Sequence, residues 1–108
     1  MSNDLLSTDQ VEDCMKSLHQ WTCNFSDLYI SKVWRFESYQ TAIAMLVKVS
    51  ELADRQNHHP EITSSYTQVR IKLWTHDANG LTSKDFELAK AIDQLVEQEF
   101  SPTKWRTS

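Results

Sequence analysis

The chain has 108 residues, of which 40% are hydrophobic, and its formal net charge is −4. This length suits a single domain over residues 1–108 with a small core, and the acidic balance argues against direct nucleic-acid binding. No run of about 18 apolar residues is present, so we expect no membrane span. The polar, acidic start of the chain lacks the features of a secretory signal peptide.

The two cysteines, Cys14 and Cys23, do not have the spacing of a zinc site. Cys14 falls in an apolar helical stripe, which favours a buried free thiol over a disulfide. Free thiols are typical of reducing compartments, so we expect a cytoplasmic protein.

The first half of the chain predicts a helix, one or two strands and a longer helix. Ser7–Gln10 has the pattern of a capping box, and apolar residues at helical spacing continue to about His19. Residues 28–36 alternate like a strand, although Lys32 interrupts the apolar face. Ser38 is the expected N-cap of the longest helix, which runs to about Gln56. Its apolar stripe consists of Tyr39, Ala42, Ile43, Leu46, Val49 and Ala53.

The second half predicts two strands and a last helix. Pro60 stops any helix, a hairpin-like region follows, and residues 69–76 alternate as the clearest strand. Asn79-Gly80 signals a turn, and Thr82–Asp85 is a second capping box. The stripe of the last helix consists of Leu88, Ala89, Ile92, Leu95, Val96 and Phe100. We expect frayed ends over residues 1–6 and 102–108, and a two-layer arrangement of helices on a sheet.

Three of the four histidines, His58, His59 and His76, are candidates for a proton-transfer site, because imidazole gives and takes protons near neutral pH. If the helix continues to His58, Asp54 lies one turn before it on the same face, where its carboxylate could bond that ring and fix its tautomer. His76 has the strand parity of Lys72 and points away from the face that forms the core.

Other interpretations of these histidines stay open. They could cap helix ends or lie on the surface, as we expect for His19. A metal site would use His58, His59 and His76 with Glu61 or Asp77. Because adjacent histidines diverge in an extended segment and a catalytic zinc site needs three converging ligands, we expect no metal.

The run Asp54-x-x-x-His58-His59-Pro60, followed by Tyr66, His76 and Asp85, resembles the signature of the pterin-4a-carbinolamine dehydratases. The segment 73–82 strengthens the resemblance, because the family has Thr-His followed by Gly-Leu-Thr or Gly-Leu-Ser there. The resemblance covers roughly residues 18–96.

The resemblance implies an α+β fold in which three helices pack on one face of a four-stranded antiparallel sheet, in the order α-β-β-α-β-β-α. It also implies a homodimer or homotetramer in which sheets and helices extend across subunits. Trp74, on the open face of its strand, would then be buried at an interface, contact a ligand, or stay exposed.

The activity implied is that of a hydro-lyase, a dehydratase that removes water from 4a-hydroxytetrahydrobiopterin. The product is quinonoid dihydrobiopterin, which a reductase recycles to tetrahydrobiopterin for an aromatic amino acid hydroxylase. One general acid and one general base suffice, so no cofactor is expected. By position, His58 and His76 match the acid/base pair, and His59 matches a substrate contact or an orienting group.

Several further residues match positions that support the site or contact the pterin. Asp54 stands where the family often has glutamate, and Asn57 where some relatives have aspartate. Trp21 either covers the pterin ring or belongs to the core. Asp85 is expected to cap the last helix rather than to act in catalysis. The full set of supporting positions is Asp54, Trp21, Asn57, Pro60, Thr75 and Asp85.

Two rival functions remain. Animal members of this family also serve as dimerisation cofactors of a homeodomain transcription factor, and some relatives assist protein assembly, so a non-catalytic scaffold is one alternative. An enzyme acting on another pterin, such as a molybdopterin-related species, is the other. The intact set of three histidines favours an enzyme, because a scaffold has no use for it.

Overall fold

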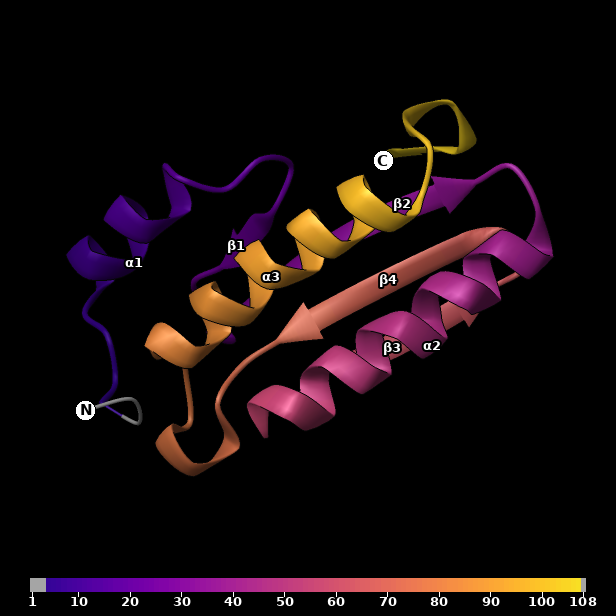
Figure 1. The fold of residues 1–108 in the computed structure, drawn as a ribbon. Coiled ribbons are helices and arrows are strands. Elements are labelled where there is room, and N and C mark those ends of the chain that lie inside the picture. The colour runs from indigo at the N-terminus through magenta and orange to yellow at the C-terminus, as the bar shows by residue number, and fades with distance from the viewer. Residues whose placement is uncertain (1–3, 108) are drawn as a thin grey trace.

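Helices cover one face of an antiparallel sheet in the computed structural model, which describes residues 4–107 (Figure 1). Two short 3-10 helices, His76–Ala78 and Pro102–Lys104, accompany the regular elements. The regular elements in chain order are α1 (Thr8–Met15), β1 (Thr22–Asn24), β2 (Tyr29–Phe36), α2 (Tyr39–Gln56), β3 (Glu61–Ser65), β4 (Gln68–Leu73), α3 (Ser83–Glu99) and β5 (Trp105–Thr107).

The sheet has the strand order β1-β2-β4-β3, and β5 pairs with residues 34–36 of β2, beyond residues 29–31, which pair with β1. In the central antiparallel pair, Ile30 lies opposite Leu73 and Trp34 opposite Val69. These four side chains are all fully buried, which confirms the face that strand alternation predicted for the core. The predicted α+β fold with three helices is therefore correct, and the sheet has five strands rather than four.

The three helices begin where the sequence predicted, because each start has a local capping pattern. Ser7 and Thr82 each form a complete capping box, and the hydroxyl of Ser38 accepts the backbone N–H of Thr41. Helices α2 and α3 lie side by side across the sheet (Figure 1). The predicted stripe of α2 was wrong at Tyr39, which is exposed, and missed Met45, which is fully buried.

A largely buried ion pair explains why a lysine interrupts the apolar face of β2. The ammonium of Lys32 lies 2.8 Å from Oδ1 of Asp93 on α3, and the indole N–H of Trp21 donates to Oδ2 of the same carboxylate at 3.0 Å. Trp21 is 6% exposed and packs edge-to-face against Trp34. Lys32 is thus satisfied within the core, as a buried charge must be.

Several predicted boundaries need correction. Helix α1 ends at Met15 rather than near His19, and β4 ends at Leu73, so His76 lies in a 3-10 helix. At the N-terminal side, Leu6 donates its backbone N–H to Leu81.

The C-terminal segment was predicted to be frayed, but residues 105–107 form strand β5. Of the predicted frayed segments, residues 1–3 and 108 lie outside the described residues.

Both cysteines are free, and both are half-buried rather than buried. Burial raises the pKa of the Cys23 thiol. Within residues 4–107, no helix is long and apolar enough to cross a membrane.

Candidate active site

The ends of α2 and β4 bring the three candidate histidines to one end of the molecule. Asn57 ends α2 in a left-handed conformation with φ of 52°, so the chain turns out of the helix before the histidines. The backbone N–H of His58 still donates to the carbonyl of Ala53. His76 begins the 3-10 turn after β4, and the backbone N–H of Thr75 closes that loop by donating to the carbonyl of Gly80 at 2.8 Å.

These segments surround an open hollow of about 280 Å3. His58 is buried at its inner wall, whereas His59 and His76 are exposed at its rim. The structure therefore brings the three predicted histidines together, although they come from two separate parts of the chain. The lining residues are Asn57, His58, His59, Thr75, His76, Asp77 and Lys84.

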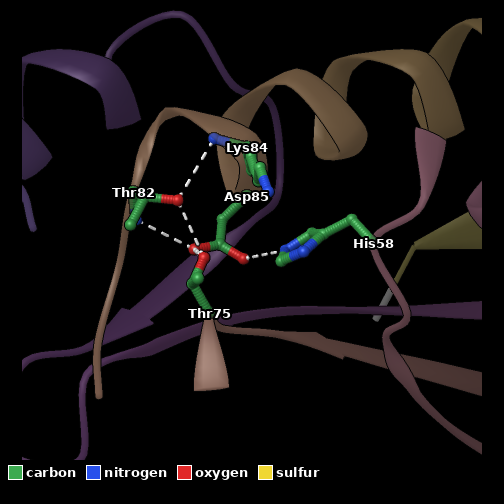
Figure 2. Close-up of polar contacts among 5 residues, drawn as sticks. All are labelled: His58, Thr75, Thr82, Lys84 and Asp85. Carbon is green, nitrogen blue, oxygen red and sulfur yellow. Dashed lines mark hydrogen bonds and ion pairs between the residues drawn. The ribbon is translucent and has the colours of Figure 1, made fainter. Parts of the chain in front are cut away.

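A buried carboxylate holds the ring of His58. Oδ1 of Asp85 lies 2.6 Å from Nε2 of His58, and Asp85 is fully buried. Its Oδ2 accepts the hydroxyl of Thr75 at 2.9 Å and the backbone N–H of Thr82 at 3.0 Å (Figure 2). The hydroxyls of Thr75 and Thr82 also contact each other at 2.8 Å. Every oxygen of the buried carboxylate thus has a polar partner.

The same hydrogen bonds position the carboxylate at the start of α3. Asp85 is the third residue of the helix, and its bond to the N–H of Thr82 is one half of the capping box. The hydroxyl of Thr82 accepts the backbone N–H of Lys84 at 3.3 Å (Figure 2). Asp85 was predicted to cap this helix and to support the site rather than to act in catalysis, and the structure shows that it both caps the helix and bonds His58.

This arrangement selects one tautomer of His58. An ionised carboxylate only accepts hydrogen bonds, so the N–H at Nε2 of His58 donates a hydrogen bond to Asp85. Nδ1 of the same ring is then the nitrogen that can accept a proton. A carboxylate that fixes an imidazole in this way is the arrangement that prepares histidine bases in hydrolases.

Asp54 has a different partner from the one predicted. Its Oδ1 lies 2.8 Å from Nε2 of His59, and both side chains are mostly exposed. The prediction that Asp54 orients His58 was wrong, because α2 ends at Gln56 and the helical spacing of four residues does not continue to His58. Each of the two adjacent histidines nevertheless has its own carboxylate.

The ring of His76 contacts an aromatic side chain. Its centroid lies 4.4 Å from that of Trp74, with the two planes tilted by 46°. Within residues 4–107, no hydrogen bond or ion pair joins the His76 side chain to another group. His76 therefore differs from the other two histidines in having an indole as its neighbour instead of a carboxylate.

The other predicted supporting residues divide into two groups. Asn57 and Thr75 line the hollow, and Pro60 is half-buried directly after His59. Trp21 does not line the hollow, because its indole is in the core and bonds Asp93. Within residues 4–107, no group of three or more histidine, cysteine and acidic side chains could hold a metal ion.

Sequence reasoning missed Lys84, which is half-buried and lines the hollow. The exposed Asp77, considered only as a possible metal ligand, lines it as well. The position of Lys84 directly before the capping Asp85 was a usable signal, because the first turn of α3 had to approach whichever group Asp85 bonds.

The chain matches known proteins over most of its length. The model of the pterin 4 alpha carbinolamine dehydratase family matches residues 4–95. A relative from Nocardia farcinica is 39% identical over 96 residues, which cover 89% of this chain and 99% of the relative. A relative from Prochlorococcus marinus is 38% identical over 95 residues, which cover 88% and 97% of the two chains. Both are named, provisionally, as pterin-4-alpha-carbinolamine dehydratases.

Two solved structures are similar to this one. A transcriptional coactivator/pterin dehydratase from Brucella melitensis has a TM-score of 0.81 at 24% identity, with 85% of this chain and 98% of that chain covered. A pterin dehydratase-like protein identified as a RuBisCO assembly factor in the alpha-carboxysome has a TM-score of 0.62 at 25% identity, with coverages of 73% and 92%. The first likeness supports the fold, and the family match rests on the sequence relatives. The chain belongs to the pterin 4 alpha carbinolamine dehydratase family.

Proposed function

We propose that the protein is a hydro-lyase that removes water from 4a-hydroxytetrahydrobiopterin and gives quinonoid dihydrobiopterin. The observation that carries this proposal is the pair formed by His58 and the buried Asp85, in a hollow that also holds His59 and His76. Family membership supports the same reaction class. A pair of proton-transfer groups is what the reaction requires, because one N–H and one C–O bond break while an O–H bond and a C=N double bond form.

The proposed reaction is balanced by one base and one acid. The base removes the proton from the ring nitrogen beside the hydroxylated carbon, and the electron pair of that N–H bond forms a C=N double bond. The C–O bond breaks as the acid protonates the departing hydroxyl, which leaves as water. Each of the two transfers contributes about 10²–10⁴-fold to the rate.

His58 suits the role of base in this scheme. Its Nδ1 is free to accept a proton, and Asp85 at 2.6 Å from Nε2 stabilises the positive charge that the ring then acquires. His76, at the rim, serves as the acid that protonates the leaving hydroxyl. His59, held by Asp54, serves as a substrate contact.

The test measures the decay of freshly made 4a-hydroxytetrahydrobiopterin by ultraviolet absorbance. Wild-type protein should accelerate the decay, and His58→Ala and His76→Ala should each lower the rate by at least about tenfold. His19→Ala is the matched control, because His19 is exposed and does not line the hollow. Its rate should equal that of the wild type.

No acceleration by folded wild-type protein would exclude the proposed reaction. Wild-type rates in both histidine variants would move the acid and base to other residues. A rate that persists in a strong chelator would exclude a metal-dependent mechanism.

A non-catalytic role in protein assembly is the second candidate. Its support is the likeness to the pterin dehydratase-like protein named as a RuBisCO assembly factor. The two candidates differ in their dependence on the histidines, because an assembly role does not require proton transfer. An inactive but folded wild-type protein that binds a large partner would favour this second function.

The natural substrate and the assembly state of this protein remain predictions. Another pterin, such as a molybdopterin-related species, would use the same acid and base, so substrates should be compared by kcat/KM. We expect a homodimer or homotetramer, which light scattering would measure. A cytoplasmic location and a link to an aromatic amino acid hydroxylase also remain predictions. A hydroxylase gene adjacent to the gene of this protein would support the link.

A further inference from the structure

The three histidines of the hollow are held by different kinds of neighbour. His58 and His59 each contact a carboxylate, at 2.6 Å and 2.8 Å respectively. Within the described part of the chain, the ring of His76 has no polar partner and lies against Trp74 at a centroid distance of 4.4 Å. Because His76 is exposed, the indole is the contact that restricts its ring.

The backbone alone does not restrict that ring. The loop after β4 is closed by the hydrogen bond from Thr75 to Gly80, and Asn79 completes it in a left-handed conformation with φ of 55°. These contacts place the Cα of His76, but its side-chain torsions are set by what the ring touches. A general acid must lie within hydrogen-bond reach of its target, so the orientation of the ring bears directly on its use.

The indole of Trp74 has a second neighbour, the ammonium of Lys72. The ammonium of Lys72 lies 5.2 Å from the centroid of the Trp74 ring and 4.1 Å from that of Tyr29. The hydroxyl of Tyr29 accepts a hydrogen bond from the side chain of Asn24 on β1 at 3.3 Å. Lys72 and Trp74 are two residues apart in an extended segment, so they lie on the same face. Cations over aromatic faces are attracted by the ring quadrupole.

We propose that Trp74 is a positioning residue for His76, and that Lys72 and Tyr29 hold the indole in place. This row of groups in contact, formed by Tyr29, Lys72 and Trp74, extends along the open face of the sheet and ends at the ring of His76. It does for His76 what Asp85 does for His58, with ring contact in place of a carboxylate. The kinetic consequence rests on the proposed dehydratase function, whereas the positioning itself does not.

The kinetic test compares Trp74→Leu with Trp74→Phe, which keeps a flat ring. Trp74→Leu should lower kcat by about 10-fold or more with little change in KM, because a misplaced acid slows the chemical step without weakening ground-state binding. Trp74→Phe should retain most of the rate. Trp105→Leu is the matched control, since Trp105 is also a half-buried tryptophan but pairs with Phe36, away from the hollow. It should leave kcat unchanged.

A second readout does not depend on activity. The ring protons of His76, identified by their loss in His76→Gln, should be displaced in the NMR spectrum from those of the exposed His19 by the indole ring current. Trp74→Leu should abolish this displacement, and Trp105→Leu should preserve it. If Trp74→Leu does not fold, Trp74→Ile carries the same comparison, because a β-branched side chain suits an extended segment.

The outcomes separate the two claims. A wild-type kcat in Trp74→Leu, or a change in KM alone, would overturn positioning and make Trp74 a bystander or a ligand contact. His76 resonances that do not respond to Trp74→Leu would overturn it as well. Inactive wild-type protein would instead overturn the proposed function, while the NMR comparison would still decide whether Trp74 positions His76.

Discussion

Asp85, in the first turn of α3, bonds His58, which follows the end of α2. The distance between Oδ1 of Asp85 and Nε2 of His58 is 2.6 Å. Its Oδ2 accepts the backbone N–H of Thr82, so one carboxylate both caps a helix and orients an imidazole. The geometry of the site is therefore tied to the packing of α2 against α3.

Thr75→Val should destabilise the protein and slow the proposed reaction. The variant removes the hydroxyl that donates to the buried Oδ2 of Asp85 at 2.9 Å, with little change in side-chain volume. A lost hydrogen bond to a charged group costs about 1.5–3 kcal/mol of unfolding free energy, which urea denaturation would measure. Thr63→Val, on the exposed strand β3, is the matched control and should change stability by less than about 0.5 kcal/mol. Equal stabilities of the two variants would contradict this account of the carboxylate.

Asp54→Asn should have a small effect on stability. The Asp54–His59 pair is mostly exposed, and exposed ion pairs contribute about 0–1 kcal/mol. The dehydration rate of Asp54→Asn should fall less than that of Asp85→Asn, because His59 is assigned a substrate contact rather than a proton transfer. Denaturation and the dehydration assay on the same sample would check both expectations. A larger rate loss from Asp54→Asn than from Asp85→Asn would reverse the roles of His58 and His59.

Removal of one partner of the Lys32–Asp93 pair should lower the free energy of unfolding more than removal of both charges. Asp93→Asn leaves a lysine that is 6% exposed without its counter-charge, which costs about 3–5 kcal/mol. The double variant Lys32→Met/Asp93→Asn should recover part of this loss, because no unpaired buried charge remains. The exposed pair of Lys48 and Glu99 is the control, and Glu99→Gln should cost about 0–1 kcal/mol. Urea denaturation that finds the double variant less stable than Asp93→Asn would contradict this reasoning.

The parts of the fold that the sequence predicted are those specified by neighbouring residues. Ser7, Ser38 and Thr82 start their helices through side chains that reach only two or three residues ahead, so the pattern is visible in the chain. The alternation in β4 likewise placed Val69 and Leu73 in the core.

The parts that the sequence did not predict depend on contacts between distant segments. His58 and Asp85 are 27 residues apart, and their contact follows from the packing of α2 beside α3. Asp54 was assigned to the wrong histidine because a left-handed Asn57, which has no strong signal at that position, ends the helix. The sequence left Trp21 either over the pterin ring or in the core, because its bond to Asp93 joins residues that are 72 apart.

The unexpected strand β5 gives a prediction of its own. Trp105 is half-buried, lies opposite Phe36 and donates its indole N–H to the carbonyl of Phe100 at 3.3 Å. Trp105→Ala should therefore cost about 1–3 kcal/mol, less than the 3–5 kcal/mol of a fully buried tryptophan. The dehydration rate should not change, because β5 pairs with the end of β2 that is far from the hollow. Thermal or urea denaturation equal to that of the wild type would show that β5 does not pack as described.

The rate of dehydration by Asp85→Asn tests the central claim most directly, namely that a buried carboxylate makes His58 a proton-transfer group. The amide has one accepting oxygen where the carboxylate has two. It therefore cannot accept the N–H of His58 together with the hydrogen bonds from Thr75 and Thr82, and kcat should fall by about 10²–10⁴-fold. Glu97→Gln, the same change of charge at an exposed position of α3, should keep the wild-type rate. A folded Asp85→Asn protein with the kcat of the wild type would contradict the claim.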